Sequence, residues 1–255
     1  MPLEQFLPLQ VYAFLLVFSR LAATVMLLPG IGEAYVPARL RLLFALLLAV
    51  IVAPLVSGFL PAEPTNIFVL FKTLMAEILI GVYIGIISRV LLLTLDSAGR
   101  FIALTIGMAN AEVFNPSISS QASLPGLLLT TMGVLILFST NMHHTLILAV
   151  AESYTMFPAG TFLPTGDMAF VLARIVSDSF RLALQISAPF IVLSLAFFMG
   201  MGMLARLMPQ LQIFFISLPV QLAGGLFVFS AVLSGLFSVF IEYYGTHVNQ
   251  FIITN

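Results

Sequence analysis

The fold class is decided by residues 67–95, which read IFVLFKTLMAEILIGVYIGIISRVLLLTL. The stretch holds three charged residues, no proline and no strict alternation of apolar and polar positions, so it favours a helix over a strand. As a helix it would be ~43 Å long at 1.5 Å per residue, against a hydrocarbon core of roughly 30 Å. The sequence therefore predicts a long apolar helix that tilts in the membrane or projects from it.

Five further stretches have the length and hydropathy of a membrane-crossing helix, and turn-rich sequence separates them. A transmembrane barrel would instead show many short segments of alternating hydrophobicity. We therefore predict an all-α, membrane-associated protein of about six long apolar helical segments that form hairpins, with no soluble domain. The predicted segments are 6–28, 41–60, 67–95, 124–150, 168–204 and 211–243.

The composition excludes most other classes of protein. Of 255 residues, 61% are hydrophobic and 7% are charged, whereas a soluble domain carries about 25% charged residues. A net charge of −1 gives no basic surface for nucleic acid, and the lack of cysteine excludes thiolate sites. Adjacent His143 and His144 would point about 100° apart on a helix, which does not suit a shared metal. With no catalytic motif either, we predict neither an enzyme nor a cofactor or metal site.

The loop charges sort by side if all six segments cross the membrane. The loops after segments one, three and five then hold all the loop arginines, and the opposite face holds only acids. Under the positive-inside rule the arginine face is cytoplasmic and both termini lie outside. The arginines are Arg39, Arg41, Arg100 and Arg206.

Two stripes of polar residues lie within the apolar segments, where an ionisable group is costly unless it is paired or hydrated. In the first, Glu77, Gly81, Gly85 and Arg89 step by four and share one helix face, and the glycines permit close helix approach. We interpret this stripe as a packing seam. A proton or ion relay would use the same residues.

The second stripe comprises Arg174, Asp178 and Arg181, whose spacings of four and three make them neighbours on a helix. It predicts either an intrahelical ion-pair stripe that faces protein, or the lining of a subunit contact or wet channel. Arg20 has no partner within a turn, so its partner must lie elsewhere in the fold or on another subunit.

Residues 204–219, LARLMPQLQIFFISLP, carry the most specific motif: an arginine, then Met-Pro-Gln-Leu, then an apolar run that ends in Leu-Pro. Residues 28–54, with a Pro-x-Arg-x-Arg run, and residues 77–90 and 96–116 follow the same family pattern in order. Together these stretches resemble the FliR family, the flagellar member of the type III export-gate proteins, whose injectisome relatives include SpaR and SctT. The resemblance spans nearly the whole chain.

The resemblance implies a structural pore subunit without catalysis. FliR-like proteins form a hetero-oligomeric ring with FliP and FliQ, with one FliR copy and with FlhB at the cytoplasmic mouth. Unfolded export substrates pass through the ring, which sits in the bacterial inner membrane at the flagellar basal body. The family fold implies one export-gate domain over 1–255, with about 1–185 resembling FliP and about 186–255 resembling a FliQ hairpin.

The resemblance also implies roles for two loops. It places a pore plug in the loop after the third segment, here 106–122, where apolar side chains can seal space and helix-breaking residues can turn the chain. It places a second turn at the cytoplasmic entrance. The expected plug residues are Gly107, Met108, Asn110, Val113, Phe114, Asn115 and Pro116; the expected entrance residues are Arg206, Met208, Pro209, Gln210 and Leu211.

Two other functions compete with this interpretation. A secondary transporter for a small solute would use the glycine-broken third and fifth segments to line a site at the membrane midplane. Such transporters often contain inverted repeats, and no convincing repeat is present. An intramembrane hydrolase would depend on Glu77 or His143, and no substrate is suggested for it.

Overall fold

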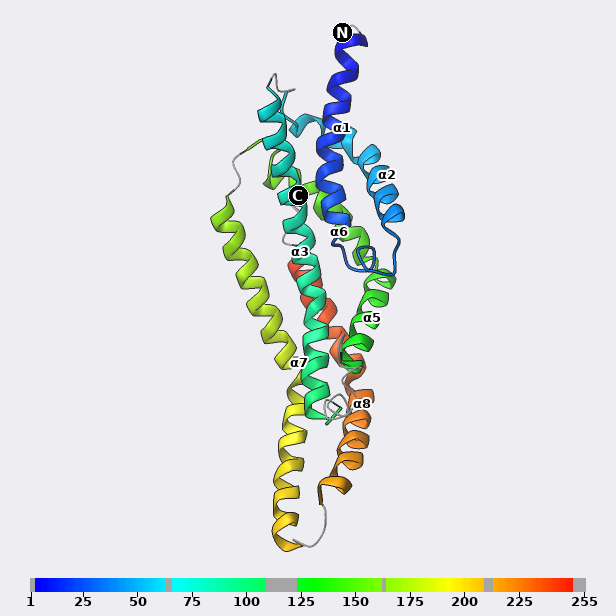
Figure 1. Cartoon of the computed structure of the whole chain (residues 1–255), viewed down its shortest axis with the longest axis vertical. Helices are drawn as coiled ribbons and strands as arrows, with labels where there is room; N and C mark the ends of the chain where they lie inside the picture. Colours follow the sequence, from blue (N-terminus) through cyan, green and yellow to red (C-terminus); the bar gives the residue numbers. More distant parts are fainter. Residues whose placement is uncertain (1–2, 63–65, 109–122, 162–163, 209–212, 250–255) are drawn as a thin grey trace. The chain divides into compact units, whose positions relative to one another are not determined.

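A computed structural model of the chain describes residues 3–62, 66–108, 123–161, 164–208 and 213–249 (Figure 1). Every regular element in these residues is a helix, which confirms the predicted all-α class. The elements are α1 (Leu3–Val25), α2 (Ala38–Val56), the short 3₁₀ turn η1 (Ser57–Phe59), α3 (Ile67–Thr105), α5 (Leu124–Ser139), α6 (Met142–Met156), α7 (Thr165–Leu207) and α8 (Ile213–Asn249).

Four helices in the described part of the chain are long and apolar enough to cross a membrane: α2 with η1, α3, α7 and α8. The bent pair α5 and α6 would make a fifth crossing if the two helices form one span. The chain is thus an all-α membrane protein, as predicted. The orientation of the termini, which rests on six crossings, stays a prediction.

Helix α3 continues past its predicted end at residue 95 and reaches Thr105, a length of 39 residues. The extension holds no proline, and Asp96 accepts a hydrogen bond of 2.9 Å from Nε of Arg100 one turn later. Arg100, expected in a loop, therefore lies on a helix. Arg39 and Arg41 likewise lie in the first turn of α2, and Arg206 lies in the last turn of α7.

The fourth predicted segment is two helices rather than one. Helices α5 and α6 meet at a bend of 75°. Asn141, which precedes α6, has a φ of 59°, a left-handed conformation that asparagine tolerates better than most residues. The helical hydrogen bonding is interrupted here, within the mostly polar stretch 139–144, although the helices on either side are apolar.

The chain forms two compact units, each assembled from separate stretches of sequence. The first comprises residues 1–91, 137–175 and 244–255, and the second comprises residues 92–136 and 176–243. In the first unit α1 and α2 lie side by side, as Figure 1 shows in blue. The proposed division near residue 185 into FliP-like and FliQ-like parts stays a prediction.

Each unit has its own apolar core. In the first unit, apolar side chains of α1 pack on small residues of α2, and in the second the end of α3 packs with α5 and α7. The buried residues include Leu16, Leu21, Ala45 and Ala49 in the first unit, and Leu95, Ile102, Leu129 and Phe190 in the second. Many large apolar side chains remain exposed on α2, α7 and α8, as expected for a protein covered by lipid or by other apolar chains.

Candidate functional site

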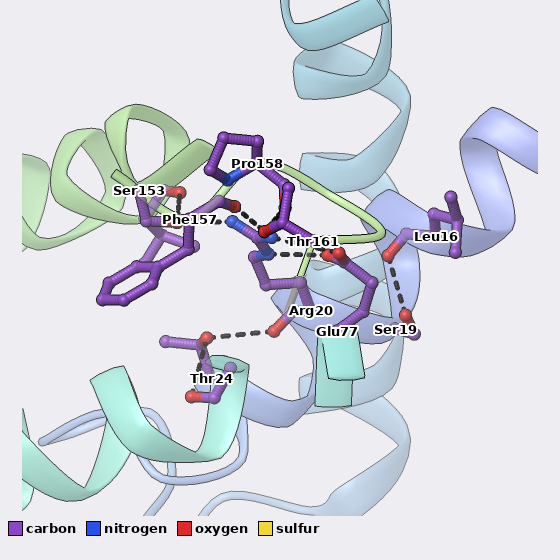
Figure 2. Close-up of polar contacts among 11 residues, drawn as sticks. Leu16, Ser19, Arg20, Thr24, Glu77, Ser153, Phe157, Pro158 and Thr161 are labelled. Carbon is purple, nitrogen blue, oxygen red and sulfur yellow. Dashed lines mark hydrogen bonds and ion pairs between the residues drawn. The ribbon is translucent and has the colours of Figure 1, made fainter. Parts of the chain in front are cut away.

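The polar centre of the first unit is a buried ion pair between Arg20 of α1 and Glu77 of α3 (Figure 2). Nε of Arg20 donates to Oε2 of Glu77 at 2.7 Å, and Nη2 donates to Oε1 at 3.1 Å. Both side chains are 0% exposed. This two-bond geometry is the strongest pairing that an arginine and a carboxylate form, and it fixes the relative register of the two helices.

The remaining arginine donors reach the third element of the site, α6 and the residue after it. Nη1 donates to Oγ of Ser153 at 3.0 Å, and Nη2 also donates to the carbonyl oxygen of Phe157 at 2.9 Å (Figure 2). The guanidinium lies 3.7 Å from the centroid of the Tyr154 ring, a cation–π contact. Arg20 therefore joins α1, α3 and α6 through one side chain.

The glycines of the first predicted stripe bring α3 into backbone contact with α1. Oγ1 of Thr24 donates to the carbonyl oxygen of Gly81 at 3.0 Å. A Cβ on Gly81 would collide with the backbone oxygen of Arg20, and a Cβ on Gly85 would lie 2.7 Å from Cβ of Leu27. Only residues without a side chain fit between the two helices at these positions.

The fourth residue of that stripe, Arg89, pairs with Glu33 after α1 at 3.6 Å, and both side chains are partly exposed. The structure thus places all four residues against α1 and the chain that follows it. Because both oxygens of Glu77 accept bonds from Arg20, the carboxylate is held as the partner of a fixed cation. This geometry suits a structural joint better than a proton relay.

Among the described residues the second predicted stripe forms no ion pairs, so the first of its two alternatives is not seen, and the lining of a subunit contact or wet channel stays a prediction. Arg174 and Arg181 are exposed, Asp178 is partly buried, and none of the three belongs to an ion pair among the described residues. Arg174 precedes the acid by one turn, which is the weaker orientation, and exposed pairs in either orientation gain little. The neighbouring residue Ser179 makes a contact with α8 instead, its Oγ lying 3.1 Å from the hydroxyl of Tyr243.

The two predicted loops are described only in part. Gly107 and Met108 follow α3 directly, and Gly107 has a φ of 82°, which ends the helix in a left-handed turn. Arg206 and Met208 are exposed at the end of α7. The other predicted residues lie outside the described residues: Asn110, Val113, Phe114, Asn115 and Pro116 of the plug, and Pro209, Gln210 and Leu211 of the entrance turn.

Sequence reasoning missed a contact in the second unit that involves Gln221 of α8. Its Nε2 donates to the carbonyl oxygen of Thr105, the last residue of α3, at 2.7 Å. A half-open apolar pocket of about 150 Å³ adjoins this contact. The signal was available, because Gln221 is a lone amide in an apolar run and two glycines follow it at helical spacing. The pocket is lined mainly by Ile106, Phe190, Leu193, Phe197, Gln221 and Gly225.

These features define a class: an all-α membrane protein whose polar groups tie helices together, with no cluster of metal-ligating side chains among the residues that the structure describes. Residues 11–246 match the family described as bacterial export proteins, family 1. The chain belongs to this family, the FliR family of the type III export gate.

Named relatives match between about two thirds and nine tenths of the chain. The flagellar biosynthetic protein FliR of Caulobacter vibrioides is 38% identical over 92% of this chain and 94% of the relative. The protein of the same name from Bacillus subtilis is 31% identical over 89% and 88%. The Yop proteins translocation protein T of Yersinia pestis is 29% identical over 69% and 68%. The chain is therefore an inner-membrane, structural component of a type III export apparatus.

Proposed function

We propose that this chain is a pore subunit of the flagellar type III export gate. It assembles with FliP and FliQ, as a single copy in their ring, around a channel for unfolded export substrates. FlhB associates at the cytoplasmic mouth, and the complex lies in the flagellar basal body. The family membership supports an export role, and the surface of α7 supports a multi-subunit assembly.

The observation that carries the proposal is the length and exposure of α7. This helix has 43 residues, or ~64 Å, which is about twice the hydrocarbon thickness of a bilayer. Exposed apolar side chains occur near both ends, with Phe170 71% exposed and Leu207 76% exposed. Lipid covers only part of such a helix, so the rest of its apolar surface is expected to face other subunits.

The arrangement of α7 and α8 in the second unit supports a C-terminal hairpin. Phe190 contacts Phe229 with ring centroids 6.1 Å apart, and Ser179 bonds to Tyr243. The two pairs run in opposite directions along the chain, so the helices are antiparallel. An antiparallel pair of helices is the arrangement expected of the FliQ-like portion, about residues 186–255, although the contact of Ser179 lies before that range. The entrance turn is proposed between the two helices.

The loop 106–122 is the proposed pore plug. Helix α3 ends at Thr105, and Gly107, with a φ of 82°, follows it in a left-handed turn at the start of this loop. A loop with helix-breaking and large apolar residues can block a narrow channel without forming part of its wall.

Deletion of residues 108–118 tests this function. We expect the complex to assemble with FliP and FliQ and the membrane to leak small ions, measured as conductance of vesicles that contain the complex. A Gly/Ser segment of equal length in the same place is the matched control for loop length, and it should also leak because it lacks the apolar side chains. Unchanged conductance in an assembled deletion complex would rule out the plug.

A further inference from the structure

The C-terminal end of α3 is held by α8 within the second unit. The last carbonyl groups of a helix have no partner in the helix itself. The carbonyl oxygen of Thr105 accepts a hydrogen bond of 2.7 Å from Nε2 of Gln221, a residue that is 9% exposed. A buried carboxamide that satisfies a helix terminus is a specific contact, because losing it leaves a buried acceptor unpaired.

One turn further along α8, Gly225 contacts Ile106, the residue that follows α3. A Cβ on Gly225 would collide with Cγ2 of Ile106 and lie 2.6 Å from Cβ of Ile106. The neighbouring Gly224 differs, because a Cβ there would meet nothing within 4 Å. Ile106 therefore fits only if position 225 lacks a side chain, whereas position 224 carries no such requirement.

The chain changes direction immediately after these two contacts. Gly107 has a φ of +82°, and a Cβ added to it would lie 3.4 Å from the carboxamide carbon of Gln221. Residues 105–107 thus all contact the same face of α8, since positions 221 and 225 are four apart. The point where the chain leaves α3 is therefore held against α8.

We propose that Gln221 and Gly225 are positioning residues that set where the loop after α3 begins. We call the contact of Gln221 with Thr105 and of Gly225 with Ile106 the α8 clasp. The role of the clasp in pore closure rests on the proposed function, in which this loop is the plug.

The chain contains no cysteine, so one introduced cysteine can carry a unique probe. Met108→Cys with a nitroxide spin label, in the assembled complex, reports the mobility of the residue that follows the clasp. We expect Gln221→Met and Gly225→Ala each to cause loss of the immobilised component of the spectrum. The matched control, Gly224→Ala, should leave the spectrum unchanged, because its methyl group meets open space.

A second variant makes the test independent of general destabilisation. In an Ile106→Ala background the collision with the methyl group added at position 225 is relieved, so Gly225→Ala should no longer change the spectrum. Equal spectra for Gly224→Ala and Gly225→Ala, or an effect of Gly225→Ala that persists without the Ile106 side chain, would overturn the clasp. If Gln221→Met does not assemble, the two glycine variants decide the question.

Conductance of the same complexes separates the clasp from the plug. If both proposals hold, Gly225→Ala leaks ions and Gly224→Ala does not. If deletion of residues 108–118 leaves conductance unchanged, the plug proposal fails, while the spin-label comparison still supports or overturns the clasp as an anchor of the loop. The clasp alone is overturned if the deletion complex leaks ions but Gly225→Ala neither changes the spin-label spectrum nor raises the conductance.

Discussion

At the scale of single residues, the Arg20–Glu77 pair combines two charges that are both removed from solvent. Taking an ion pair out of water costs several kcal/mol, so the pair gains stability only if geometry and further hydrogen bonds offset that cost. Here Ser153, Phe157 and the ring of Tyr154 supply the additional contacts. The pair is therefore best understood as a joint that selects one arrangement of α1, α3 and α6.

Removing one partner of this pair should be far more harmful than removing both. We expect Glu77→Gln or Arg20→Met to destabilise the protein by about 3–5 kcal/mol, because the other group is left buried and poorly paired. The double change Arg20→Met with Glu77→Leu should recover much of that loss. The thermal unfolding midpoint of the purified complex measures both effects.

The exposed pair of Arg100 and Asp96 provides the control for this prediction. Arg100 has a 58% exposed side chain, so Arg100→Ala should change stability by less than about 1 kcal/mol. Equal midpoint shifts for Glu77→Gln and Arg100→Ala would contradict the assignment of the buried pair as a joint.

Both residues of the buried pair could be singled out from the sequence, but their pairing could not. Arg20 and Glu77 are 57 positions apart, and no helical spacing relates them. What the spacing did predict is that Glu77 shares a face with Gly81, Gly85 and Arg89, and the structure places that face against α1 and the chain after it. Gln221 could be noticed as a lone amide in an apolar run, but its partner, the carbonyl oxygen of Thr105, is known only once α3 lies beside α8.

At the scale of helices, the close approach of α1 and α3 depends on residues that have no side chain. Oγ1 of Thr24 reaches the backbone of Gly81 because the two helices touch at that point. The glycine spacing seen in the sequence therefore corresponds to a contact of α3 with α1. Gly81 faces the backbone of Arg20, so the seam also holds the arginine in position for Glu77.

A methyl group in this seam should separate the helices. We expect Gly81→Ala to destabilise the protein by about 1–3 kcal/mol, because its Cβ would collide with a backbone oxygen that cannot move aside alone. Gly166→Ala, in the first turn of α7, adds the same group where nothing lies within 4 Å and should be neutral. The comparison is made by thermal unfolding of the two complexes, and a neutral Gly81→Ala would contradict the seam.

Helix boundaries were predicted less well than helix identities, and the reasons are local. Hydropathy marks where a segment is apolar, whereas a helix continues as long as its backbone N–H and C=O groups form hydrogen bonds with each other. Helix α3 runs through the more polar residues 96–105, which carry the Asp96–Arg100 pair. The opposite occurs at Asn141, where one left-handed residue divides an apolar segment into α5 and α6.

At the scale of the whole molecule, the low charge content and the exposed apolar side chains both indicate a surface that is covered by lipid or by other apolar chains. Only 7% of the residues are charged, yet α2, α7 and α8 expose many large apolar side chains. A helix of ~64 Å extends beyond the roughly 30 Å that lipid hydrocarbon covers. The all-α membrane class was predictable from composition and segment length, whereas the covering of the excess surface is a property of the assembly.

The mass of the native complex tests the central claim most directly. We expect the affinity-tagged chain, extracted in mild detergent, to co-purify with FliP and FliQ at a mass that fits one copy of this chain with several copies of each partner. The chain purified without its partners should be unstable in detergent, because the apolar surface that FliP and FliQ would cover is left exposed. A stable monomer or small homo-oligomer without FliP and FliQ, as expected of a small-solute transporter, would contradict the account.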